Sequence, residues 1–155
     1  MNISFASNGE YEIKELPHRL EAGTRNIAGV IGMGAAIDYL QSIGLDKIHE
    51  YEVELKKYLI DRISTVPNIK IYNKNLDTGV LLFNIKGYFS QDVAIYLNKF
   101  KVCIRAGNHC AKMLQEVIDK TNTCRVSLYF YNTKEEIDVL VNALMDQDKI
   151  LETVV

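Results

Sequence analysis

Apolar residues change their spacing along the chain, and each spacing predicts a different element. From residue 27 to residue 40 almost every position is apolar or glycine, which predicts a helix buried all round. From residue 46 to residue 63 apolar residues recur every three or four positions, as on one face of an amphipathic helix. We expect Asp46 to cap that helix and Pro67 to follow its end. Its predicted inner face consists of Ile48, Tyr51, Leu55, Leu59 and Ile63.

Shorter apolar runs between turn residues predict strands. Two runs, 69–72 and 80–85, are joined by a turn at residues 73–79 and suit a hairpin-like pair. Two further strands are expected at 101–105 and 125–131. Their pairing and alternation favour an antiparallel or mixed sheet with helices packed on it, in the α/β or α+β class.

Three more helices are predicted between and after these strands. Ser90 is expected to cap a helix through Phe100, and residues 111–119 suit a short helix. Thr133 and Glu136 form a capping box at the start of the last helix. Residues 1–22 are polar and predict irregular structure, with Pro17 as a breaker.

Composition narrows the class of protein. The 155 residues are 48% apolar and 25% charged, as in one globular domain, and the net charge of −2 gives no reason to expect nucleic acid as a partner. The longest apolar stretch, 27–37, is too short to span a bilayer, so no membrane is expected. The first ten residues lack the basic and apolar regions of a signal peptide, so we expect a cytoplasmic protein.

The three cysteines differ in their surroundings. Their spacing matches no common zinc or iron–sulfur pattern, so no metal site is predicted. Cys103 and Cys124 lie in apolar, strand-like runs and are expected to be small buried hydrophobic residues. Cys110 follows Gly-Asn-His in a predicted loop, where no apolar pattern requires it. We therefore expect Cys110 to be the reactive thiol.

The segment Arg105-Ala-Gly-Asn-His-Cys110 carries the clearest candidate chemistry, together with Thr123-Cys-Arg125-Val-Ser. A thiol is a nucleophile only as the thiolate, which nearby cations favour. Two arginines could also hold a carboxylate through bidentate hydrogen bonds, although each one alone could be a surface charge. His109 is either a general base or a residue that only orients the loop, because neighbouring residues of an extended segment point to opposite sides.

Thr24 and Asn26 stand just before the first predicted helix. The backbone amides of a helix start suit an anion such as phosphate. Capping of the helix by either side chain is the simpler explanation, and both remain open. The glycines that follow do not have the spacing of a dinucleotide-binding motif, and no strand is predicted before them.

Three stretches together resemble a known family. These are Leu20-Glu-Ala-Gly-Thr24-Arg-Asn-Ile with the glycine-rich helix after it, Arg105-Ala-Gly-Asn-His-Cys110-Ala, and Thr123-Cys-Arg125-Val-Ser-Leu-Tyr-Phe-Tyr131-Asn-Thr. They are similar to class V aminotransferases, most closely to the cysteine desulfurase and selenocysteine lyase branch that supplies sulfur for iron–sulfur cluster assembly. The resemblance covers nearly the whole chain, in order.

The resemblance implies part of a homodimeric, pyridoxal-phosphate-dependent enzyme of fold type I. Such an enzyme converts L-cysteine to alanine and leaves a persulfide for a sulfur-acceptor protein; selenocysteine is the alternative substrate. Residues 27–155 would be its small C-terminal domain, with a mostly antiparallel sheet, and residues 1–26 would join it to a large cofactor-binding domain.

The resemblance also implies roles for single residues. Cys110 would accept the sulfur as a persulfide, and Arg125, assisted by Arg105, would bind the substrate carboxylate. Asn108 and His109 would shape the cysteine loop. Thr24 would reach the phosphate of the cofactor held by the other subunit.

The chain departs from the family pattern at several positions. Asn108 stands where a second histidine is common, Arg25 replaces a proline, and Lys112-Met113 replaces a residue followed by proline. The lysine that holds the cofactor would lie in the large domain, so we expect the chain alone to bind no cofactor and to be inactive. The alternatives are a non-catalytic binding module or fragment, and another class V aminotransferase or selenocysteine lyase.

Overall fold

The computed structural model describes residues 3–21, 23–75, 77–118 and 122–154, and it divides into two compact units. Residues 1–43 form the first unit and residues 44–155 the second. The expected division into a joining segment, residues 1–26, and a small domain, residues 27–155, stays a prediction.

The first unit begins with a β-hairpin, where the sequence predicted irregular structure. Strands β1 (Ile3–Ser7) and β2 (Glu10–Ile13) pair in antiparallel orientation. Asn8 and Gly9 join them with positive φ angles of 49° and 89°, a conformation that Asn-Gly turns favour. The prediction for residues 1–22 was therefore wrong, and this dipeptide was the signal against it.

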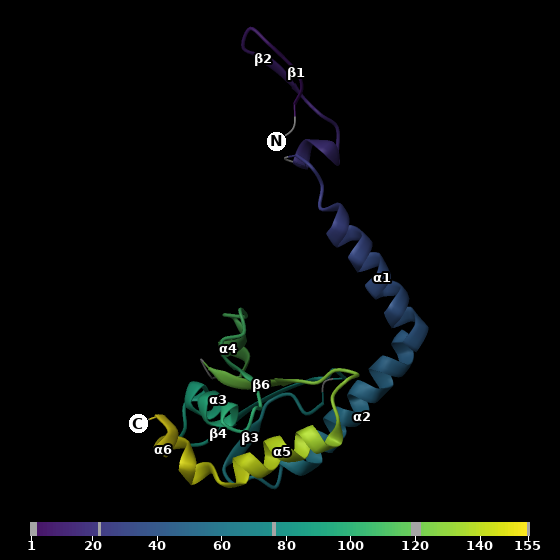
Figure 1. The fold of residues 1–155 in the computed structure, drawn as a ribbon. Coiled ribbons are helices and arrows are strands. Elements are labelled where there is room, and N and C mark those ends of the chain that lie inside the picture. The colour runs from purple at the N-terminus through teal and green to yellow at the C-terminus, as the bar shows by residue number, and fades with distance from the viewer. Residues whose placement is uncertain (1–2, 22, 76, 119–121, 155) are drawn as a thin grey trace. The chain divides into compact units, whose positions relative to one another are not determined.

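Helix α1 (Ile27–Ile43) follows a short 3-10 helix (His18–Leu20). Its position agrees with the prediction, but the expected burial was wrong. Figure 1 shows α1 as one continuous helix. The helix has no buried residue, and Ile31 is 68% exposed. The small hairpin of this unit is therefore not a cover for its apolar side chains.

The second unit is built on a four-stranded antiparallel sheet, as predicted. Its strands are β3 (Ile69–Ile71), β4 (Val80–Ile85), β5 (Arg105–Gly107) and β6 (Thr123–Ser127), in the order β3-β4-β6-β5. The fold is thus mixed α/β, with the two central strands far apart in sequence.

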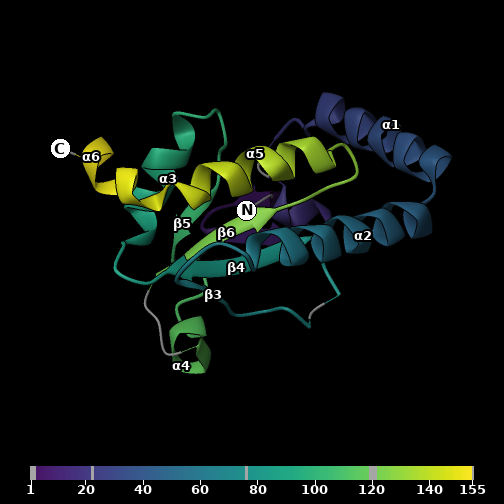
Figure 2. The same cartoon turned by 90° about the horizontal axis from the view of Figure 1, so that it is seen from below.

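Helices α2 (Leu45–Ile63), α3 (Ser90–Asn98) and α5 (Lys134–Met145) pack against this sheet. Figure 2 shows α2 and α5 side by side across β4 and β6, while the short helix α4 (Leu114–Ile118) lies apart from them. A 3-10 turn (Gln147–Lys149) and helix α6 (Ile150–Val154) end the chain beside α3.

The hydrophobic core lies between the three helices and one face of the sheet. Leu81, Phe83 and Ile85 alternate along β4 with half-buried residues that face the other way. The predicted face of α2 is confirmed, since its apolar residues are buried apart from the half-buried Tyr51. The opposite face of the sheet carries polar residues such as Arg125 beside the half-buried Val80 and Leu82.

Two predicted caps and two predicted strand ranges were wrong. Gly44, at φ 99°, is the N-cap of α2, and Phe89 is the N-cap of α3, so neither Asp46 nor Ser90 has that role. Lys101, where the first of these strands was predicted to begin, has a left-handed backbone with φ 59°, and β5 begins only at Arg105. Strand β6 ends at Ser127, earlier than predicted. A turn follows it, in which Asn132 Oδ1 accepts a hydrogen bond from the Tyr129 amide.

The predicted capping box of α5 is present. Thr133 Oγ1 accepts a hydrogen bond from the Glu136 amide, and the Glu136 carboxylate accepts one from the Thr133 amide.

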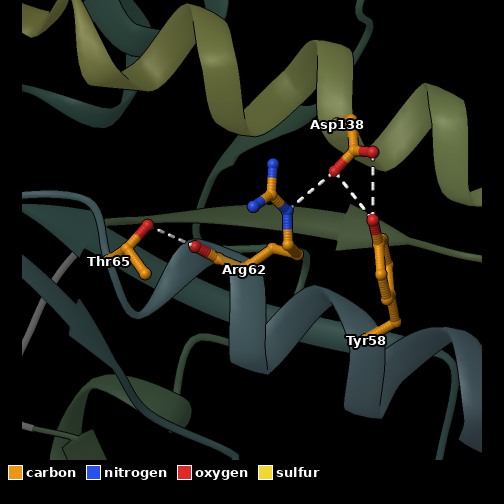
Figure 3. Close-up of polar contacts among 4 residues, drawn as sticks. All are labelled: Tyr58, Arg62, Thr65 and Asp138. Atoms are coloured by element: carbon orange, nitrogen blue, oxygen red, sulfur yellow. Dashed lines mark hydrogen bonds and ion pairs between the residues drawn. The ribbon is translucent and has the colours of Figure 1, made fainter.

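Further along α5, Asp138 accepts hydrogen bonds from Arg62 Nε at 2.8 Å and from the Tyr58 hydroxyl at 2.9 Å (Figure 3). These bonds, first that of Tyr58, lower the pKa of Asp138. They link α2 to α5 at the surface, where ion pairs stabilise little.

No single helix in the described ranges is long and apolar enough to cross a membrane; only α1 and α2 counted together meet that test of length and composition.

Candidate active site

Two arginines lie side by side on the face of the sheet opposite to the core helices α2, α3 and α5. Arg105 of β5 is the direct register partner of Arg125 of β6, so both side chains leave the same face. Like charges in directly opposite positions repel one another. The pairing therefore favours a bound anion, and a carboxylate matches the fork of a guanidinium.

A tight loop carries Cys110 beside this arginine pair. Gly107, His109 and Cys110 have positive φ angles of 118°, 55° and 58°, and Asn108 accepts a hydrogen bond from the Ala111 amide at 2.9 Å. Positive φ is uncommon outside glycine, so the loop is a strained turn. It leaves Cys110 exposed, as the sequence predicted for a reactive thiol.

The Cys110 sulfur is in direct contact with one of the two arginines. Arg105 Nη2 donates a hydrogen bond to Cys110 Sγ at 3.1 Å. A positively charged donor at this distance stabilises negative charge on sulfur, which is the reactive form. The structure thus brings together two of the residues that the sequence singled out.

His109 turns away from the thiol toward the sheet. Its Nε2 lies 2.7 Å from Thr123 Oγ1. Burial, and then the charges of Arg125 and Arg105, lower the pKa of His109, which favours the neutral imidazole. This geometry favours the second alternative from the sequence, a histidine that orients the loop.

Two buried nitrogens at the site have no hydrogen-bond partner within the described part of the chain. They are Arg125 Nε and His109 Nδ1. Buried polar atoms without partners cost free energy, so their presence indicates a place for an acceptor. Arg125 is half-buried, in contrast to the exposed Arg105. Arg125 is therefore the better placed of the two to hold a ligand.

The residues before α1 belong to the other unit. Asn26 Oδ1 accepts a hydrogen bond from the Gly29 amide at 3.0 Å, which is the bond of an N-cap. The capping interpretation therefore holds for Asn26. Thr24 is exposed two residues earlier, while Arg25 pairs with Glu21 at 2.9 Å. The expected contact of Thr24 with the phosphate of a cofactor held by the other subunit stays a prediction.

The other two cysteines behave differently from one another. Cys124 is fully buried, as predicted, and burial raises its pKa to about 12, so it is inert at neutral pH. The prediction for Cys103 was wrong, because Cys103 is exposed. It lies before β5 rather than in it, and it lines a pocket of about 330 Å³. Within the described residues no three acidic, histidine or cysteine side chains form a metal site.

Thr123 is the site residue that sequence reasoning did not single out. It contacts His109 and is 1% exposed, opposite Gly107 in the sheet register. A lone threonine at the start of an apolar strand gives no signal. Only the register of β5 against β6 shows where its hydroxyl lies.

Comparison with known proteins places this site in a family. The sequence profile of the family described as aminotransferase class-V matches residues 1–140. The chain belongs to this family. It is similar to a probable cysteine desulfurase of Halalkalibacterium halodurans, with 47% identity over 92% of this chain and 35% of that protein. A cysteine desulfurase of Wigglesworthia glossinidia brevipalpis is 41% identical over 88% of this chain and 33% of that protein.

Solved structures agree with this assignment to the class-V aminotransferases. The cysteine desulfurase CsdA of Escherichia coli aligns with a TM-score of 0.83 and 31% identity, over 97% of this chain and 37% of that one. A cysteine desulfurase of Thermococcus onnurineus also gives 0.83, with 32% identity, over 96% and 38% of the two chains. The chain therefore spans about a third of the length of the relatives that it matches.

Proposed function

We propose that this chain is the small C-terminal domain of a cysteine desulfurase, in which Cys110 accepts sulfur from L-cysteine. The hydrogen bond from Arg105 to the exposed Cys110 sulfur, with Arg125 beside it, carries this proposal. Another class V aminotransferase would have no use for a loop thiol. Asn108 completes the turn through its carbonyl oxygen, and His109 anchors it.

The family depends on pyridoxal phosphate, and the chain offers donors that suit a bound substrate and cofactor. Arg125 Nε could donate to the carboxylate of an amino acid. Thr24 could donate to the cofactor phosphate, because it precedes the start of α1, whose first turn has no acidic residue to repel an anion. When bound, the cofactor supplies an electron-withdrawing system for the electron pair left on the substrate carbon. The chain's own residues bind the substrate and receive the sulfur.

Sulfur transfer can then be written in terms of Cys110. The Cys110 thiolate attacks the sulfur of L-cysteine, a sulfur–sulfur bond forms, and the bond between that sulfur and the β-carbon breaks. The β-carbon gains a proton, so the products are alanine and a persulfide on Cys110. Arg105 stabilises negative charge on the attacking sulfur, and Arg125 fixes the substrate carboxylate.

Mapping the persulfide tests this proposal directly. In a chimera, this chain replaces the matching third of the Halalkalibacterium halodurans relative. We expect L-cysteine to produce a persulfide on the Cys110 peptide, seen by mass spectrometry after alkylation, because only Cys110 is both exposed and next to an arginine donor. Cys103, which is also exposed, is the internal control. A persulfide on Cys103, or on neither cysteine in a chimera that binds the cofactor, contradicts the proposal.

We further propose that the chain by itself does not desulfurate cysteine. The resemblance assigns the lysine that binds the cofactor to the large domain, and the chemistry requires that lysine. After incubation with pyridoxal phosphate and removal of free cofactor, we expect the chain to retain no visible absorbance band. A retained band that shifts with L-cysteine would show that a lysine of this chain replaces the missing one.

We also propose that the parent protein is a cytoplasmic homodimer that passes sulfur to an acceptor protein. The exposed apolar side chains of α1 support a homodimeric parent or contact with the large domain, since such surfaces are usually covered. A sulfur-acceptor protein would take the persulfide from the exposed Cys110. Three free cysteines fit the reducing cytoplasm.

A further inference from the structure

Thr123 lies where the strained cysteine loop meets the sheet. Its side chain is 1% exposed, and its Oγ1 lies 2.7 Å from His109 Nε2. The sheet register places it opposite Gly107, the residue at which the loop leaves β5. The hydroxyl is thus enclosed at the base of the loop.

The loop needs such an attachment because its backbone is unfavourable. His109 and Cys110 are consecutive residues in the left-handed region, with φ 55° and 58°. Such conformations persist only where the surroundings hold them. A hydrogen bond to a buried hydroxyl is stronger than one in water, and this bond acts on the first of the two strained residues.

We propose that Thr123 is a positioning residue, whose hydroxyl holds the His109 imidazole and thereby keeps Cys110 Sγ on Arg105 Nη2. The chain of contacts is continuous: Thr123 to His109 at 2.7 Å, the peptide bond from His109 to Cys110, and Cys110 to Arg105 at 3.1 Å. Its meaning for sulfur transfer rests on the proposed function, whereas the attachment itself is a property of this chain.

The neutral state of His109 is consistent with this role. Burial and the two arginines lower its pKa, so one ring nitrogen accepts and the other donates. A hydroxyl can serve as donor or acceptor, and Thr123 therefore satisfies Nε2 in either tautomer. Valine has nearly the same shape without this ability.

Alkylation of the chain itself tests the proposal. Iodoacetamide modifies both exposed thiols, so the ratio of the Cys110 rate to the Cys103 rate can be measured by mass spectrometry. Thr123→Val removes the hydroxyl and keeps strand propensity, whereas Thr123→Ser keeps the hydroxyl. We expect Thr123→Val to lower the ratio at least about threefold, because the thiol leaves the cation that favours its reactive form, and Thr123→Ser to stay within about twofold.

A double-mutant cycle separates positioning from a general effect on the strand. His109→Asn keeps a residue that tolerates the left-handed backbone but is too short to reach Thr123. We expect it to lower the ratio by the same factor, and Thr123→Val to cause no further change in that background. The proposal is overturned if the two substitutions together lower the ratio by the product of their single effects. It is also overturned if His109→Asn leaves the ratio unchanged, or if Thr123→Ser lowers it as much as Thr123→Val does.

Two features keep the result clear. His109→Asn changes the loop alone, so it tests the attachment even where Thr123→Val loosens the core and makes the buried Cys124 reactive. No cysteine turnover or cofactor enters the measurement. Failure of the proposed desulfurase activity would therefore leave this result standing, and a failed attachment would leave the sulfur acceptor assigned to Cys110.

Discussion

Replacing Cys110 with alanine is expected to stop the turnover of L-cysteine in the chimera, by at least about a thousandfold in kcat. In the proposed reaction this thiol bonds to the sulfur that leaves the substrate, and Arg105 donates its hydrogen bond to the same thiol. The fully buried Cys124 is excluded because burial raises its pKa to about 12. Alanine formation from L-cysteine is the measurement.

Cys103→Ala is the matched control for this loss. It removes a second exposed thiol of the same chain, outside the arginine pair, and we expect full activity. Selenocysteine is the informative second substrate, because selenium leaves carbon more readily than sulfur does. Turnover of selenocysteine by the Cys110→Ala variant shows that the rest of the site is intact. Normal turnover of L-cysteine by that variant would remove Cys110 from the proposed role.

Periodicity predicted the part of the fold that a core stabilises. The inner face of α2 and the hairpin-like pair of β3 and β4 follow directly from apolar spacing, because those side chains pack within this chain. The same reasoning was wrong for the burial of α1. Its apolar composition shows that the helix suits burial, but composition does not say which surface covers it.

Only some contacts of the candidate site could likewise be predicted from the sequence. Arg105 and Cys110 are five residues apart, so their contact across a short loop is predictable from sequence. The pairing of Arg105 with Arg125 depends on the register of two strands, and so does the contact of Thr123 with His109. The register of two strands depends on the packing of the whole sheet, so the sequence of one strand does not determine it. Cys103 is exposed in the segment between α3 and β5, and no local pattern signalled that this segment is not a strand.

Replacing Arg125 with lysine is the second change with a large expected effect. Lysine keeps the charge but loses the planar fork that binds a carboxylate through two hydrogen bonds. Arg125 Nε is buried and has no hydrogen-bond partner in the described part of the chain, so its N–H is available to an acceptor on a bound substrate. We expect the KM of the chimera for L-cysteine to rise about a hundredfold, which corresponds to one bidentate charged pair.

Arg105→Lys is the comparison that gives this result its meaning. Arg105 donates to the Cys110 sulfur, so its loss should lower kcat and change the KM for L-cysteine much less. The two arginines are register partners on one face of the sheet, and both replacements keep the positive charge. Opposite effects on KM and kcat would therefore assign the carboxylate to Arg125 and the thiolate to Arg105. Equal effects on both parameters would show that the two guanidiniums act as one anion site and that neither has a separate partner.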